Sequence, residues 1–191
     1  QYLRERVSES LGLLYATHYP YRQYETGRGV RKSAIHDRLV SAVACHGEAY
    51  GWERPNWYAP EGIEARYEYS YGRQNWFEHS AAEHFAVREG VALFDLSSFA
   101  KFRCEGRDAA GVLNRICANN VDVSVGRVIY TQWLNELGGI EADLTITRLS
   151  ENAFLVVTAA ETEVRDFYWL KQHIPETAHC VLTNVTSGMG V

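Results

Sequence analysis

The stretch RVIYTQWLNELGGIEADLTIT, residues 127–147, decides the fold class. Two runs rich in β-branched and aromatic residues, 127–133 and 140–147, flank the turn-forming sequence 135–139. Such runs are typical of strands, and Gly138-Gly139 between them suits a tight turn that needs glycine at a positive φ. The stretch therefore predicts an antiparallel hairpin.

Segments on both sides extend this pattern. Further short strands are predicted at Ala92–Asp95, Ala100–Cys104, Ala153–Thr158 and Ala178–Val185. Helices are predicted at His79–Glu89, at Glu161–His173, and after Asp108, which can act as N-cap to a helix with the buried stripe Val112, Leu113 and Ile116. Because the helices do not strictly alternate with the strands, an α+β fold is favoured over a doubly wound parallel sheet. We expect a mixed or antiparallel sheet with helices on one face.

The first 78 residues have a different character. Leu3, Val7, Leu11 and Leu14 recur at helical spacing and predict an amphipathic helix over 2–14. From residue 15 to 71 aromatics and glycines dominate, and only 35–50 has the pattern of another helix. We therefore expect a loop-rich connector at 1–78 and a regular domain at 79–191. The chain starts without Met and stops just after a predicted strand, so we expect it to be a piece of a longer protein.

Composition excludes several classes of function. No apolar run approaches the roughly 18 residues of a membrane span. The net charge of -5, with both signs interspersed, gives no attraction to a nucleic acid. The four cysteines form no C-x-x-C pair and lie mostly in apolar surroundings, so we interpret them as reduced and structural. This favours the cytoplasm, or the mitochondrial matrix in a eukaryote.

Asp143 is the residue with most chemical interest. It lies in a predicted strand whose other members are mostly apolar, so its carboxylate is either solvated or placed in a pocket. The pattern alone does not decide, although aspartates are mostly exposed. His79 and His84 are five residues apart and face different sides of a helix, and no other group has ligand spacing, so no metal site is predicted.

Two motifs resemble a known family. The segments EHFAVREGVALFDLSS at 83–98 and YTQWLNELGGIEAD at 130–143 are similar to the folate-binding domain of the glycine-cleavage T-protein, or aminomethyltransferase, family. The resemblance covers about residues 79–191. Before it, GWERPNWYAP at 51–60 resembles the connector between the flavin and folate domains of dimethylglycine and sarcosine dehydrogenases, which a stand-alone T-protein lacks.

The resemblance implies a function for a larger enzyme. FAD in an upstream domain would oxidise an N-methyl amine such as dimethylglycine or sarcosine. The present chain would contribute tetrahydrofolate binding and capture the one-carbon unit as 5,10-methylenetetrahydrofolate. The chain has no recognisable flavin motif, so we do not expect it to bind FAD or to oxidise amines by itself. The missing partners implied are the flavin domain and the C-terminal half of the folate domain.

The resemblance also assigns site residues. Asp143 matches the acidic residue that hydrogen-bonds tetrahydrofolate near N10 and assists the reaction of that nitrogen. Tyr130, Phe99 and Val157 match positions that contact the folate. The chain departs from the family at Ser98-Phe99, where T-proteins often have His-Met, and at Ala159, where an asparagine can contact folate.

Two other functions stay open. The first is a stand-alone aminomethyltransferase of glycine cleavage, against which the segment 51–60 argues. The second is a non-catalytic folate-binding or scaffold domain that keeps the fold without the transfer. Asp143 favours chemistry over the scaffold.

Overall fold

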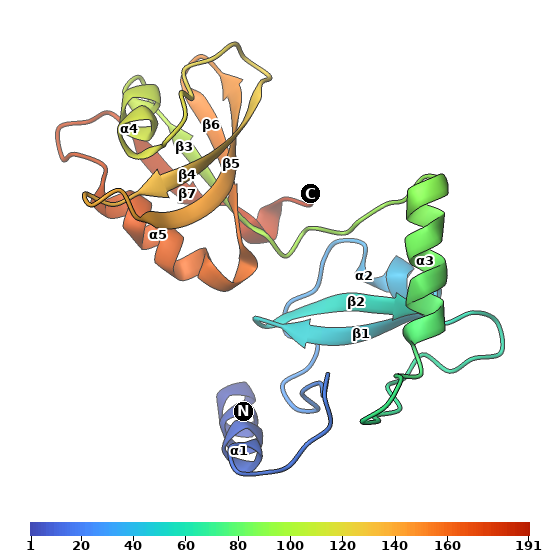
Figure 1. Cartoon of the computed structure of the whole chain (residues 1–191). Coiled ribbons are helices and arrows are strands. Elements are labelled where there is room, and N and C mark those ends of the chain that lie inside the picture. The colour runs from blue at the N-terminus through green and yellow to red at the C-terminus, as the bar shows by residue number, and fades with distance from the viewer. The chain divides into compact units, whose positions relative to one another are not determined.

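The computed structural model describes all of residues 1–191 and divides them into two compact units, Gln1–Asp95 and Leu96–Val191. Each unit combines helices with an antiparallel sheet, so the predicted α+β class is confirmed (Figure 1). Unit 1 has a two-stranded sheet and unit 2 a five-stranded one.

Unit 1 is built around a hairpin. Strands β1 (Ala44–Ala49) and β2 (Trp52–Tyr58) pair antiparallel, and helices α1 (Tyr2–Leu13), α2 (His36–Ser41) and α3 (Phe77–Glu89) complete the unit. Tyr50 and Gly51 form the two-residue turn, with φ of 55° and 84°. Positive φ at both central residues gives a turn whose twist matches that of the strands.

Several predictions for this region change. The helix predicted over 35–50 is wrong beyond residue 41, because Val43 has a φ of 60° and the next residues pair with β2. The segment 15–71 is therefore less irregular than expected. The predicted first helix is confirmed as α1, but its apolar stripe is exposed, at Leu3, Val7, Leu11 and Leu14.

Polar and aromatic contacts hold unit 1 together. Its buried apolar cluster contains only Cys45, Trp57 and Ala59. Arg28 donates hydrogen bonds from Nε and Nη2 to the two carboxylate oxygens of Glu53. The same carboxylate also accepts a hydrogen bond from the Gly29 amide. The guanidinium of Arg31 lies 4.3 Å from the ring centre of Trp52.

Unit 2 contains the larger sheet. Its strands are β3 (Ala100–Glu105), β4 (Val128–Leu134), β5 (Ile140–Ser150), β6 (Ala153–Thr158) and β7 (Val181–Asn184), in the order β4-β5-β6-β3-β7. All neighbours are antiparallel. The helices are α4 (Ala109–Ile116) and α5 (Glu163–Gln172), with short 3-10 turns η1 (Ala160–Thr162) and η2 (Thr186–Gly188).

The hairpin predicted from residues 127–147 is confirmed as β4 and β5, and Gly138 in its turn has a φ of 79°. The strand predicted at 92–95 is wrong, because no other strand pairs with it. Asp108 stands at the N-cap of α4 but makes no side-chain capping bond to that helix. Its carboxylate oxygen Oδ2 instead accepts a hydrogen bond from the His179 amide nitrogen, at 2.7 Å. This bond ties the start of α4 to the segment before β7.

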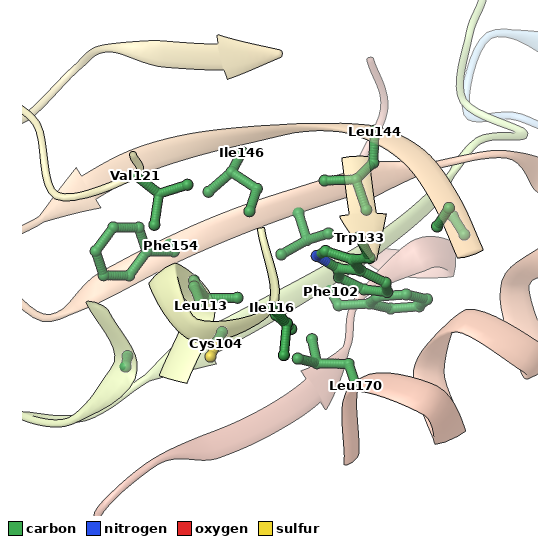
Figure 2. Close-up of a cluster of buried hydrophobic side chains, with 14 residues drawn as sticks. Phe102, Cys104, Leu113, Ile116, Val121, Trp133, Leu144, Ile146, Phe154 and Leu170 are labelled. Carbon is green, nitrogen blue, oxygen red and sulfur yellow. The ribbon is translucent and has the colours of Figure 1, made fainter. Parts of the chain in front are cut away.

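Both helices of unit 2 pack on the same face of the sheet, as expected. Figure 2 shows Leu113 and Ile116 of α4 and Leu170 of α5 in one cluster with Phe102 and Trp133 of the strands. Alternate residues along a strand point to opposite faces, so the odd-numbered residues of β5 lie on the face away from these helices. That second face carries the candidate site.

Candidate functional site

A cavity of about 480 Å³ lies on the sheet face opposite the helices. This volume is within the range of pockets that bind small molecules. It is lined by Leu96, Phe99, Tyr130, Asp143, Leu144, Thr145, Val157, Thr158, Ala159 and Val191.

The structure brings together all four residues that the resemblance assigned. Tyr130, Asp143 and Val157 come from β4, β5 and β6, and Phe99 comes from the loop before β3. Tyr130 pairs with Thr145, and Thr145 with Val157, so these side chains form one row across three strands. Ala159 also lines the cavity, so the departure from the family at this position changes the cavity wall. The roles of these residues stay predictions.

The carboxylate of Asp143 is held by both of its oxygens. The Tyr130 hydroxyl donates to Oδ2 at 2.8 Å, and the Gln132 amide Nε2 donates to Oδ1 at 2.9 Å. Gln132 is the direct cross-strand partner of Asp143, and Tyr130 is its diagonal neighbour. The two donors fix the plane of the carboxylate and leave its remaining lone pairs for a ligand.

The proton between Tyr130 and Asp143 stays on the phenol. The hydrogen bond to Asp143, together with the negative charge of that residue, raises the pKa of Tyr130. A phenol with a raised pKa is protonated at neutral pH, so Tyr130 acts as a donor and Asp143 as an acceptor.

Sequence reasoning missed Gln132, although it lies inside the quoted motif. The signal was available in the register, because a hairpin closed by 135–139 places Gln132 opposite Asp143 on the same face. A glutamine there has the length and the amide needed to reach a cross-strand carboxylate.

Lys101 stabilises the loop that forms one wall of the cavity. It pairs with Val157 in register and is fully buried. Its ammonium donates to the carbonyls of Ser97 and Phe99, each at 2.8 Å. These bonds hold the loop before β3 against the sheet and so place Phe99 beside the row of Tyr130, Thr145 and Val157.

A second anchor fixes the other wall. The buried carboxylate of Asp166 on α5 accepts hydrogen bonds from the hydroxyls of Thr158 and Thr162, each at 2.6 Å. Thr158 ends β6, so this contact ties the last residue of that strand to the helix that follows. The backbone at Thr158 and Ala159 is thereby set at the edge of the cavity.

The arrangement suits a flat ligand with both apolar and polar parts. Leu96, Phe99 and Val157 offer apolar surface, while Asp143 offers a fixed proton acceptor at one side. No group of three or more His, Cys, Asp or Glu side chains is placed to hold a metal ion. No helix has the length and apolar character needed to cross a membrane.

Comparison with known proteins assigns the family. The model of the GCVT N-terminal domain matches residues 35–191, which is most of the chain. The chain belongs to the GCVT N-terminal domain family. In addition, residues 1–33 match the FAD dependent oxidoreductase central domain.

Curated relatives of this GCVT N-terminal domain chain are much longer proteins. It is 50% identical over 171 residues to the 4-methylaminobutanoate oxidase (formaldehyde-forming) of Paenarthrobacter nicotinovorans, covering 90% of this chain and 21% of the relative. It is 32% identical to the human mitochondrial dimethylglycine dehydrogenase, over 100% of this chain and 22% of the relative. It is also 32% identical to the mitochondrial pyruvate dehydrogenase phosphatase regulatory subunit of Mus musculus, over 97% and 22%. The chain thus spans about a fifth of these relatives.

A solved structure has the same fold. The glycine cleavage system aminomethyltransferase T from Bartonella henselae matches with a TM-score of 0.64 and 24% identity, over 83% of this chain and 39% of that chain. The likeness agrees with the T-protein-like fold that the motifs predict.

Proposed function

We propose that this GCVT N-terminal domain chain belongs to a longer flavin-dependent enzyme that oxidises an N-methyl amine, and that its cavity binds tetrahydrofolate for one-carbon capture. Residues 1–78 would connect the flavin oxidoreductase portion to a folate-binding portion at 79–191. The match of residues 1–33 to a flavin oxidoreductase domain and the names of two relatives support the amine oxidation. Methylenetetrahydrofolate would be the product, and FAD would be bound outside this chain.

The observation that carries the folate proposal is the fixed carboxylate at the edge of an apolar cavity. A folate has flat rings that fit between apolar walls. It also has an N–H group that can donate a hydrogen bond to a carboxylate. The walls are Leu96, Phe99 and Val157, and the acceptor is Asp143, so the residues present fit the cofactor.

Tetrahydrofolate, when bound, supplies a nucleophilic nitrogen for the one-carbon unit. Asp143 would accept a hydrogen bond from that nitrogen and take its proton as the new bond to carbon forms. Tyr130 and Gln132 act as positioning residues, because each donates to one carboxylate oxygen and fixes its direction. Asp143 and Tyr130 are exposed in this chain, so water would be excluded from the acceptor only where the bound folate covers it.

The test separates oxidation from capture in the longer protein. Dimethylglycine or 4-methylaminobutanoate is supplied with an electron acceptor, with and without tetrahydrofolate, and free formaldehyde is measured against methylenetetrahydrofolate. We expect tetrahydrofolate to divert the carbon from formaldehyde. Asp143→Asn should lower this diversion about 100-fold, the size typical for loss of a general acid-base group, and leave amine consumption unchanged.

Glu151→Gln serves as the matched control, because this exposed carboxylate lies in the turn after β5 and outside the cavity. It should leave diversion unchanged. An Asp143→Asn protein that still diverts the carbon normally contradicts the role of Asp143, and an absence of any diversion contradicts the folate proposal.

A non-catalytic role is the second candidate function. It is favoured by the similarity to a regulatory subunit over nearly the whole chain. In that case the chain would bind tetrahydrofolate, measurable by calorimetry, while the longer protein neither consumes amines nor forms methylenetetrahydrofolate.

A further inference from the structure

Two thiols meet in unit 2, away from the cavity. Cys104 lies on β3 and is fully buried among the core residues that Figure 2 shows. Cys180 immediately precedes β7, the edge strand that pairs only with β3. The register pairs Cys104 with Leu182, so Cys180 is its diagonal neighbour on the same face. The two Sγ atoms are 3.2 Å apart.

One of these thiols can be reached from solvent. Cys180 is half-buried and lines a surface cleft with Phe167, Lys171 and Leu182. Cys104 is fully buried and in contact with Cys180. The geometry therefore places an accessible thiol in front of a buried one.

The two thiols also differ in acidity. The hydrogen bond with Cys180, together with burial, raises the pKa of Cys104. The hydrogen bond from Cys104 lowers the pKa of Cys180, against an opposing effect of burial. Cys180 therefore ionises first, and the thiolate is the form that attacks an electrophile.

We propose that Cys104 and Cys180 form an oxidation site at which hydrogen peroxide converts the two thiols into a disulfide. The Cys180 thiolate attacks one peroxide oxygen, the O–O bond breaks, and Cys180 becomes a sulfenic acid while hydroxide leaves. The Cys104 sulfur then attacks the Cys180 sulfur, its own proton passes to the hydroxyl oxygen of the sulfenic acid, and the S–O bond breaks as water leaves. In total two thiols and one peroxide give one disulfide and two waters.

Closure of the bond requires only a short movement. The Sγ atoms must approach from 3.2 Å to about 2.0 Å. Cys180 can supply this shift because it lies outside the regular part of an edge strand, whereas Cys104 is fixed in β3 between β6 and β7. The proposal does not rest on folate binding, since neither cysteine lines the candidate cavity.

The remaining cysteines are internal controls. Burial raises the pKa of Cys117 to about 12 and that of Cys45 to about 11, against smaller opposing effects, so both stay protonated at neutral pH. Cys117 packs against the core that contains Cys104. It therefore tests whether proximity to this core is by itself enough for oxidation by peroxide.

The experiment treats the full chain with hydrogen peroxide, traps remaining thiols by alkylation under denaturing conditions, and maps the peptides by mass spectrometry. We expect loss of two hydrogens and one linked pair of peptides that contain Cys104 and Cys180. Cys45 and Cys117 should be recovered fully alkylated. Cys180→Ser should abolish the link, and Cys117→Ala should preserve it.

Three results would overturn the proposal: no change in mass, a link that includes Cys117, or oxidation of Cys180 to the sulfinic acid without any link. The mapping of the unsubstituted chain decides the matter even if a variant folds poorly. Circular dichroism of Cys180→Ser checks that loss of the link does not reflect unfolding.

Discussion

Unit 1 and unit 2 have similar lengths but are held together by different forces. Unit 2 contains fourteen buried residues in one continuous apolar cluster, whereas the buried cluster of unit 1 contains three. Unit 1 relies instead on charged groups bound to one another, such as Arg6 with Glu48 and Arg28 with Glu53. The difference shows why regular hydrophobic periodicity predicted one unit well and the other poorly.

The largest loss of stability is expected from Trp133→Ala. Trp133 is fully buried and stacks on Trp169 with ring centres 5.0 Å apart. Removing the indole leaves a cavity in the core, which costs about 3–5 kcal/mol. Hydrogen exchange by mass spectrometry should show loss of protection in the peptides of β3 to β7 and none in β1 and β2. Equal losses in both units would contradict the separation of their cores.

A smaller effect is expected from Glu53→Gln in unit 1. The Glu53 side chain is 6% exposed and Arg28 31% exposed. Breaking a partly buried pair leaves a cation without its counter-charge, at a cost of about 2 kcal/mol. Faster hydrogen exchange in β1 and β2 should report this loss of stability.

The matched control for this substitution is Glu68→Gln. Glu68 pairs with Arg66, and both side chains are about 60% exposed. Surface pairs of this kind contribute about 0–1 kcal/mol, so protection should hardly change. If the two glutamine variants behaved alike, the ion pairs of unit 1 would not hold it together.

A local effect is expected at low pH, through Glu9 of α1. Burial alone would raise the pKa of this carboxyl, but hydrogen bonds from Thr26, Glu25 and Arg22 outweigh it and lower the pKa to about 2. The stabilisation is therefore fully present above the ordinary glutamate pKa of 4.5 and is lost as pH falls through about 2. The protection of the amides in α1 and residues 25–26, taken relative to the intrinsic exchange rate at each pH, should fall over this interval. Glu9→Gln should remove this pH dependence, and a variant with an unchanged profile would contradict the assignment.

The candidate site was predictable in part. Tyr130 and Asp143 belong to a hairpin that the sequence predicts with its turn, so a shared face followed from strand geometry. Gln132 was within reach of the same argument. Lys101 was not, because a lysine within a predicted strand gives no sign that it is fully buried and bonded to the carbonyls of Ser97 and Phe99.

The failures of prediction share a physical cause. Residues 44–49 have little strand propensity of their own and become a strand because Trp52–Tyr58 pairs with them. The stretch 92–95 has the composition of a strand and stays irregular because it has no partner strand. Strand formation depends on a neighbour more than on local preference.

The sequence by itself determined the α+β class, the elements of unit 2 and the hairpin that presents Asp143, because alternating apolar residues and turn glycines act over a few residues. Only the tertiary structure decided that Phe99 and Val157 meet Tyr130 in one cavity, and that Cys104 meets Cys180. These contacts join residues far apart in the chain, and they depend on strand order, which no local pattern specifies.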